Sequence, residues 1–170
     1  MKQVFLLTGV PGSGKTSIIK QIAAEHRGQV IGFYTEEIRV NAVREGFRLV
    51  TLDGQQAILA STDIKSPYRI AKYGVDLTVL ENIGVPALLR DGALVIVDEI
   101  GKMEMLSLKF REAILQVIES GRPMLATVML HPHTWADVIK NRPEAKLAMV
   151  NRQNHEPIID EIHKWLKEML

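Results

Sequence analysis

The chain contains no cysteine, which excludes disulfide bonds, thiolate metal ligands and catalysis by a cysteine nucleophile. It also lacks a net charge of any size, because 21 basic and 20 acidic residues leave only +1. We therefore expect no nucleic-acid partner and no membrane-surface partner. No apolar run approaches the roughly 18 residues of a membrane span, and no signal-peptide pattern precedes the first apolar run. These absences lead us to expect a cytoplasmic protein that holds any anionic ligand in a local site.

The residues that are present indicate one α/β domain. The chain has 170 residues, of which 46% are hydrophobic and 24% charged, an ordinary balance for a protein with a substantial core. It shows no repeats, low-complexity tracts or long linkers. We predict a single domain over residues 1–170, with a three-layer α/β fold around a mostly parallel sheet.

The most informative stretch is GVPGSGKT, which matches the phosphate-binding pattern G-x-x-x-x-G-K-[ST]. Its glycines let backbone N–H groups approach an anion at the start of a helix. We expect Lys15 to reach the β- and γ-phosphates and the Thr16 hydroxyl to bind Mg²⁺. The residues predicted to bind nucleotide are Gly9, Val10, Pro11, Gly12, Ser13, Gly14, Lys15 and Thr16.

The context of this stretch is the one that the pattern requires. Lys2 to Thr8 is an apolar run of strand length, and Ser17 to His26 carries apolar residues at helical spacing. A strand, a glycine loop and a helix in this order favour a real phosphate site over a chance match.

A second informative stretch places two acids after a buried strand. Ala93 to Val97 is a continuous apolar run, typical of a central parallel strand, and Asp98 and Glu99 follow it. Ligands of open parallel sheets bind beyond the carboxyl ends of the strands. We expect Asp98 to hold Mg²⁺ through a water molecule and Glu99 to orient and deprotonate an attacking water. Alternatively, the two acids only cap the next helix, but the phosphate loop favours the site.

Between these two stretches the pattern predicts antiparallel strands. Val30–Arg39, Phe47–Leu52 and Gln56–Ala60 read as strands, and Asp53-Gly54 is a hairpin signal. We therefore predict an antiparallel hairpin extension around residues 30–61. Its basic residues are candidate stabilisers of charge at the γ-phosphate, although a solvated strand face or a surface ion pair is the favoured role for each arginine taken singly: Arg39, Arg44 and Arg48.

The remaining elements follow from periodicity and capping signals. Further helices are expected over Thr78–Arg90, Ser107–Gly121 and Thr134–Lys140 and from Pro157 onward, with strands over Met124–Leu130 and Ala145–Val150 and a loop over Asp63–Gly74. Thr78 and Glu81 form a capping-box pattern. His131 and His133 lack a third metal ligand, so we expect a loop there. Trp135 could stack on a base, but packing is the favoured role.

Several motifs occur together in one known family. They are GVPGSGKT, GFYTEEIR (32–39), GFRLVTL (46–52), KYGVDL (72–77) and VDEIGKME (97–104). The chain resembles the small P-loop nucleoside-triphosphatase family, sometimes called cancer-related nucleoside-triphosphatase. The resemblance runs from the first strand to about Val150 and continues more weakly through Asn151–His155.

This resemblance implies a function and a strand order. It implies Mg²⁺-dependent hydrolysis of nucleoside triphosphates with broad base tolerance. It also implies a RecA-like sheet in which another strand separates the phosphate-loop strand from the acid-bearing strand. Carried over by position, the nucleotide site is completed by Asp98, Glu99, Ile100, Gly101 and Lys102. Lys102 is a further candidate cation for the γ-phosphate.

Other functions remain compatible with the sequence. A phosphate loop of this type also opens small-molecule and nucleotide kinases, and residues 30–61 could form the lid that a kinase needs. A nucleotide-dependent switch is a third reading. The N-K-x-D signature of a guanine pocket is absent, since the nearest string, Asn151-Arg152-Gln153-Asn154, lacks the acid. This favours ATP or several nucleotides over GTP alone. The sequence indicates no oligomeric state, and an arginine from a second copy is also conceivable.

Overall fold

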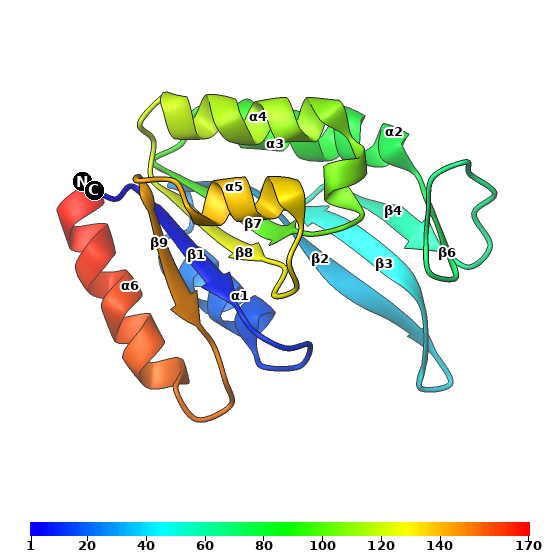
Figure 1. Ribbon diagram of the computed structural model, residues 1–170, viewed down its shortest axis with the longest axis horizontal. Helices are drawn as coiled ribbons and strands as arrows, with labels where there is room; N and C mark the ends of the chain where they lie inside the picture. The colour runs from blue at the N-terminus through cyan, green and yellow to red at the C-terminus, as the bar shows by residue number, and fades with distance from the viewer.

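The computed structural model describes all 170 residues as a nine-stranded sheet with helices on both faces (Figure 1). The strands are β1 (Val4–Thr8), β2 (Val30–Val40), β3 (Val43–Thr51), β4 (Gln56–Ser61), β5 (Arg69–Ile70), β6 (Tyr73–Val75), β7 (Leu94–Ile100), β8 (Met124–Val128) and β9 (Ala145–Met149). The helices are α1 (Lys15–Glu25), α2 (Leu77–Val79), α3 (Val85–Leu89), α4 (Leu108–Glu119), α5 (Thr134–Lys140) and α6 (His155–Met169). A π-helical turn, η1 (Leu80–Gly84), joins α2 to α3, and a 3₁₀ turn, η2 (Glu104–Leu106), follows β7.

The strand order is β5-β6-β4-β3-β2-β7-β8-β1-β9. The five strands β2, β7, β8, β1 and β9 pair with their neighbours in parallel. The strands β5, β6, β4, β3 and β2 pair antiparallel. Strand β8 lies between β1 and β7, so the predicted RecA-like order is confirmed. The predicted hairpin extension is also confirmed, since β2, β3 and β4 form it.

Both faces of the sheet are buried by helices, because successive side chains of a strand point to opposite faces. Leu6 and Val97 face a cluster of 27 buried residues that includes side chains of α3, α4 and α5. Phe5 and Ile96 face the other way, into a cluster of 14 buried residues with α1 and α6. Burial of each such side chain stabilises the fold by about 1.5–3 kcal/mol, so the parallel strands form a rigid base for the loops at their ends.

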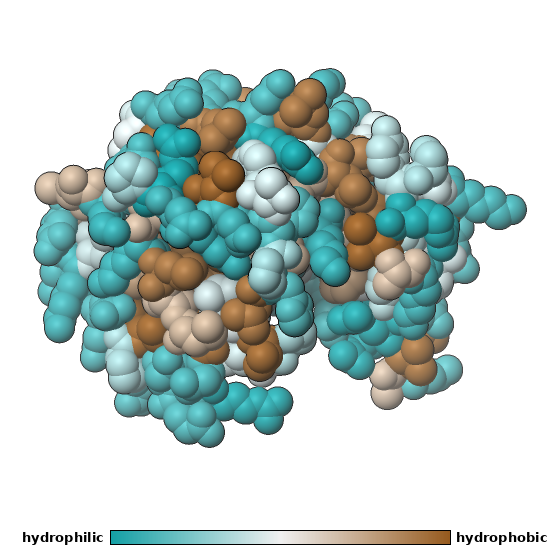
Figure 2. Space-filling view, in the orientation of Figure 1, coloured by the Kyte–Doolittle hydropathy of each residue, from teal (hydrophilic) through white to brown (hydrophobic).

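One part of the sheet extends beyond the edge where the parallel strands end. Strand β2 pairs with β7 only over Val30–Phe33, and from Tyr34 to Val40 it pairs with β3 alone. We call residues 34–50, which contain this part of β2 and the part of β3 that pairs with it, the wing. Figure 1 shows the wing extending from the sheet, and Figure 2 shows the surface hollowed between it and the body that carries β1 and β9. The wing and the phosphate loop therefore line two sides of one hollow.

The structure corrects three details of the prediction. Strand β7 continues to Ile100, so Asp98 and Glu99 lie inside the strand, because Ile100 is fully buried and pairs with Val128. The cap of α2 is Asp76, whose carboxylate accepts from the Thr78 N–H at 3.0 Å, and not the predicted Thr78–Glu81 box. Short strands β5 and β6 occur in and beyond the segment expected to be a loop.

None of the helices combines the length and the apolar character that a membrane crossing requires.

Candidate active site

The glycine loop follows a path that only glycine permits at its narrowest points. Gly14 has a φ of 99°, in the left-handed region, and α1 begins at the next residue. A Cβ at Gly14 would overlap the ring of His155, and one at Gly9 would lie 2.5 Å from the Val150 carbonyl oxygen. The loop is therefore packed tightly against the segment that follows β9.

Lys15 lies across the mouth of this loop. Its ammonium nitrogen donates to the carbonyl oxygens of Gly9, at 2.8 Å, and Val10, at 3.1 Å. The first N–H groups of α1 open onto the same loop, because the first turn of a helix leaves its N–H groups unpaired. The predicted residues thus come together as a cradle with one positive side chain at its opening.

Asp98 and Thr16 meet beside this cradle. The Thr16 hydroxyl donates to Asp98 Oδ2 at 2.7 Å, and the Thr127 hydroxyl of β8 donates to Asp98 Oδ1 at 2.6 Å. Burial raises the pKa of the Asp98 carboxyl, whereas the two hydroxyls and the charge of Lys15 lower it. Two predicted metal ligands from different elements are in direct contact. Thr127 was missed by the sequence prediction, although a polar residue in the apolar run of β8 is a signal.

The chemistry of these donors fits Mg²⁺. A hydroxyl and a carboxylate are hard oxygen ligands, and Mg²⁺ in phosphate sites uses one or two carboxylates together with phosphate and water oxygens. No group of three or more His, Cys, Asp or Glu side chains is placed to hold a metal ion. Thr16 and Asp98 therefore fit a cation shared with phosphate and not one enclosed by protein alone.

Glu99 lies next to Asp98 with its carboxylate folded against Gly101. A Cβ at Gly101 would overlap the Glu99 carboxylate, so the glycine makes room for it. Burial and the charge of Asp98 raise the pKa of Glu99, whereas Lys15 lowers it. A carboxylate with a raised pKa is a stronger base, which suits proton abstraction from water.

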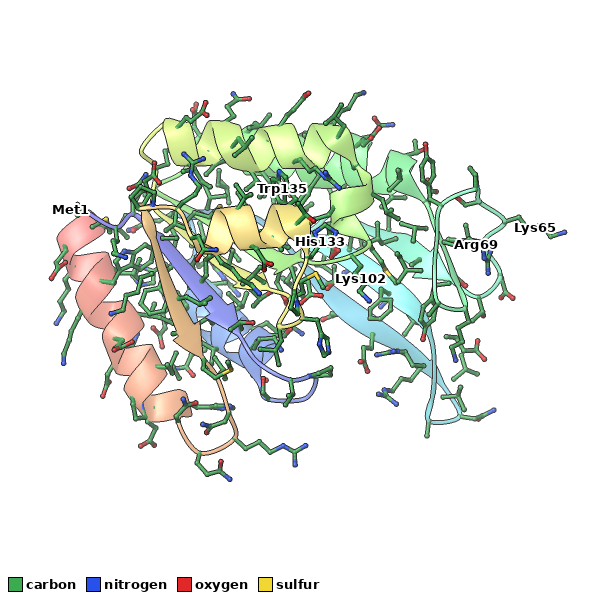
Figure 3. All side chains as sticks on the ribbon, in the orientation of Figure 1. Met1, Lys65, Arg69, Lys102, His133 and Trp135 are labelled. Carbon is green, nitrogen blue, oxygen red and sulfur yellow. The ribbon has the colours of Figure 1, made fainter.

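The other members of the predicted acidic segment are placed differently. The side chain of Ile100 is fully buried in the core, so only its backbone can face a nucleotide. Lys102 is exposed and forms no ion pair. Figure 3 places Lys102 between the wing and the loop after β8, which carries His133.

Glu104 is a buried acid that the sequence prediction missed. It follows β7 in η2 and only 4% of its surface is exposed. Burial, and then the charge of Glu99, raise the pKa of Glu104 well above its ordinary value, whereas the N–H groups of Glu104 and Glu99 lower it. Its proton is therefore retained more strongly than that of a solvated glutamate.

The raised pKa of Glu104 predicts a dependence of stability on pH. When folding raises the pKa of a carboxyl, its contribution to stability is fully present at pH values below the pKa of the unfolded chain, which is about 4.3 for glutamate. This contribution is lost as the pH rises through the pKa of the folded state. Each raised pKa unit corresponds to about 1.4 kcal/mol. We expect Glu104→Gln to stabilise the protein at pH 8 relative to the wild type, and to do so less at pH 5. Urea midpoints at the two pH values measure this.

The exposed Glu112→Gln serves as the control for this comparison, because Glu112 forms no ion pair on α4. An equal change of midpoint at both pH values in Glu104→Gln would contradict the raised pKa.

The three candidate arginines of the wing have different surroundings. Arg39 and Arg44 both pair with Glu37, at 2.7 and 3.3 Å. Arg44 also donates to the Tyr73 hydroxyl at 2.9 Å, which ties it to β6. Arg48 forms no ion pair and lies opposite Glu36 in the sheet register. The structure thus leaves only Arg48 without a carboxylate partner.

His133 and Trp135 have structural roles. The His133 Nδ1 atom accepts from the Trp135 N–H at 3.2 Å and so caps α5. Trp135 packs against the larger core cluster, with the Arg111 guanidinium 5.7 Å from its ring. Figure 3 shows both residues at α5. This agrees with the predicted packing role of the tryptophan.

The segment after β9 touches the phosphate loop, which the sequence prediction did not foresee. Arg152 Nε donates to the Gly12 carbonyl at 3.4 Å, and His155 Nε2 lies 2.6 Å from the Ser13 carbonyl oxygen. The sequence signalled this contact only through the string Asn151–Asn154, which is the nearest match to the N-K-x-D motif of a guanine pocket but lacks its acid.

A cavity of about 590 Å³ lies elsewhere. It is lined by residues such as Ala23 of α1, Tyr34 of β2 and Thr51 of β3, and by none of the predicted site residues. The candidate active site is therefore the loop cradle and its neighbouring acids, not this cavity.

The fold and the site together define a P-loop protein of RecA-like strand order. A protein-family model described as "NTPase" matches residues 4–163. The nucleoside-triphosphatase THEP1 of Thermotoga maritima is 44% identical over 167 residues, which cover 95% of this chain and 94% of that protein. The cancer-related nucleoside-triphosphatase homolog of Bos taurus is 33% identical over 181 residues, with 95% of each chain covered.

Solved structures of proteins with these names have the same fold. The crystal structure of THEP1 from the hyperthermophile Aquifex aeolicus is similar with a TM-score of 0.86 and 33% identity, over 94% of this chain and 96% of that one. The solution structure of a human cancer-related nucleoside triphosphatase gives a TM-score of 0.83 and 32% identity, over 98% of each chain. This chain belongs to the NTPase family of P-loop proteins, and the resemblance found in its motifs is confirmed.

Proposed function

We propose that this chain hydrolyses nucleoside 5′-triphosphates to the diphosphate and inorganic phosphate. The oxygen of a water molecule forms a bond to the γ-phosphorus, and the bond from that phosphorus to the β,γ-bridging oxygen breaks. The observation that carries this proposal is the contact of Thr16 with Asp98 at 2.7 Å, beside a phosphate cradle and one residue from Glu99. Relatives named nucleoside-triphosphatases support it.

Each residue has a separate task. Residues Gly9–Thr16 bind the phosphates, and the Lys15 ammonium, at the mouth of the loop, binds the β- and γ-phosphates. Thr16 and Asp98 would hold Mg²⁺, and Thr127 orients the Asp98 carboxylate. When bound, Mg²⁺ would neutralise charge on the β- and γ-phosphate oxygens.

Glu99 is the proposed base. Its carboxylate accepts the proton of the attacking water, a role that its burial favours because burial raises its pKa. Gly101 provides the space for that carboxylate. Lys102 is an exposed cation at the same end of the sheet and is available to the phosphates.

We propose broad base tolerance as well. The Asn154 amide stands where a guanine pocket would carry its acid, but its Oδ1 accepts from the Asn151 N–H and its Nδ2 donates to the Met149 carbonyl, both at 2.8 Å. These two bonds commit the amide to fixing the turn, and the position carries no carboxylate that could select guanine.

A phosphate-release assay tests the proposed function. Purified protein is incubated with Mg²⁺ and with ATP, GTP, CTP or UTP in turn, and no acceptor is added. We expect phosphate and diphosphate in equal amounts from all four nucleotides, and none when EDTA removes the metal. Turnover that begins only after an alcohol or nucleotide acceptor is added would instead identify a kinase.

Arg48 is the wing residue that we propose as a charge stabiliser. It lies opposite Glu36, which pairs with Lys20 of α1 at 2.7 Å, so it faces the side of the sheet on which α1 lies. We expect Arg48→Ala to lower kcat by about tenfold or more with little change in KM, since such arginines act chiefly in the transition state. Arg39→Ala, which removes an arginine paired with Glu37, is the control and should leave kcat nearly unchanged. Equal rates in the two variants would remove Arg48 from the site.

A further inference from the structure

The segment of residues 151–155 is held against the outer side of the phosphate loop. His155 packs on Gly14 and contacts the Ser13 carbonyl, while Arg152 Nε donates to the Gly12 carbonyl. These contacts are made to carbonyl oxygens and not to the inward N–H groups that receive phosphate. The segment therefore borders the loop without entering the phosphate cradle.

Hydrogen bonds between its own residues also fix the conformation of this segment. The Asn151 N–H donates to Asn154 Oδ1, and the Gln153 N–H donates to Asn151 Oδ1, both at 2.8 Å. Together with the bond from Asn154 Nδ2 to Met149, these contacts engage the side chains of both asparagines. Arg152 is left as the side chain that a preformed turn presents to solvent.

The strand order gives the direction in which a bound nucleotide must run. Asp98 and Glu99 lie on β7, on one side of the phosphate-loop strand β1, and residues 151–155 follow β9, on the other side. If the γ-phosphate lies toward Glu99, as the proposed function requires, the nucleoside extends toward the β9 side. The base therefore lies near Arg152.

The guanidinium of Arg152 has the properties of a stacking surface. It is exposed, it forms no ion pair, and its only hydrogen bond is the 3.4 Å contact from Nε to Gly12, so most of its N–H groups are left to solvent or a ligand. Guanidinium planes stack on bases of any identity. We propose that Arg152 is the platform on which the base stacks, and that this contact, without readout of the base edge, explains acceptance of several nucleotides. This inference rests on the proposed function.

Binding of diphosphates tests the platform without any need for hydrolysis. Calorimetric titration with Mg²⁺ measures the affinity of the wild type and of Arg152→Ala for ADP, GDP, CDP, UDP and pyrophosphate. Because loss of a stacking surface weakens binding of any base, we expect a loss of roughly tenfold or more in affinity for every nucleotide. The affinity for pyrophosphate, which has no base, should not change. Arg27→Ala, an exposed arginine at the far end of α1, is the control and should bind all five ligands normally.

Two further variants separate stacking from charge. Arg152→Tyr keeps a planar surface without the charge and should restore nucleotide affinity, whereas Arg152→Lys keeps only the charge and should not. Weaker pyrophosphate binding in Arg152→Ala, or rescue by lysine, would overturn the proposal in favour of a phosphate contact. Unchanged nucleotide affinity, or a loss for one base alone, would overturn it too. A wild type that binds none of the five ligands would contradict the proposed function itself.

Discussion

Glu99→Gln is expected to lower the rate of phosphate release by about 10²–10⁴, which is the usual contribution of a general base. The amide has nearly the same shape as the carboxylate and keeps its place against Gly101, but it cannot accept the proton of the attacking water. Binding should remain within a few-fold of the wild type, because the phosphates are held by the loop and not by Glu99.

The measurement pairs single-turnover phosphate release with calorimetric binding of Mg²⁺–ADP. Glu112→Gln, on the exposed face of α4, is the matched control and should leave both quantities unchanged. A Glu99→Gln enzyme that hydrolyses ATP at the wild-type rate would remove Glu99 from the mechanism. A parallel loss of ADP affinity would instead identify Glu99 as a binding residue.

Lys15→Ala is expected to weaken binding and hydrolysis together. The ammonium lies at the mouth of the loop, where charge-assisted hydrogen bonds to phosphate contribute about 1.5–3 kcal/mol each. A loss of roughly tenfold to a hundredfold in ADP affinity follows. The fold should tolerate the change, because the Val10 carbonyl lies at the exposed side of the loop, where water can replace the ammonium.

The same titration with ADP and with pyrophosphate measures this effect, and thermal unfolding checks that the variant is folded. Both ligands should be affected equally, in contrast to Arg152→Ala, which should weaken binding of the nucleotide alone. Lys164→Ala, an exposed lysine of α6, is the control. Undiminished ADP affinity in Lys15→Ala would contradict the assignment of the phosphate loop.

The loop and the acid pair could be predicted because each depends on a short stretch of sequence. Gly9–Thr16 has a fixed spacing between a strand and a helix, and Asp98 follows a continuous apolar run. The strand order was also predicted correctly, but that prediction came from the family resemblance and not from the periodicity of the sequence. The end of β7 was misjudged because acids usually mark the end of a strand, whereas here Ile100 is buried and extends the pairing.

The rest of the site depends on contacts between residues far apart in the chain. Thr127 reaches Asp98 only because β8 lies beside β7, and Arg152 reaches Gly12 only because β9 lies beside β1. The pairing of Arg39 and Arg44 with Glu37 likewise depends on the register of the wing. No local pattern encodes such distances, so these roles could not be read from the sequence.

The most direct test of the central claim follows the oxygen of the attacking water. Hydrolysis of Mg²⁺–ATP in ¹⁸O-labelled water, with no acceptor present, should place one labelled oxygen in the released phosphate and none in ADP, because water attacks the γ-phosphorus. Mass spectrometry of both products measures this. Label in ADP, or no phosphate release without an acceptor, would contradict the assignment of this site as a γ-phosphate hydrolase.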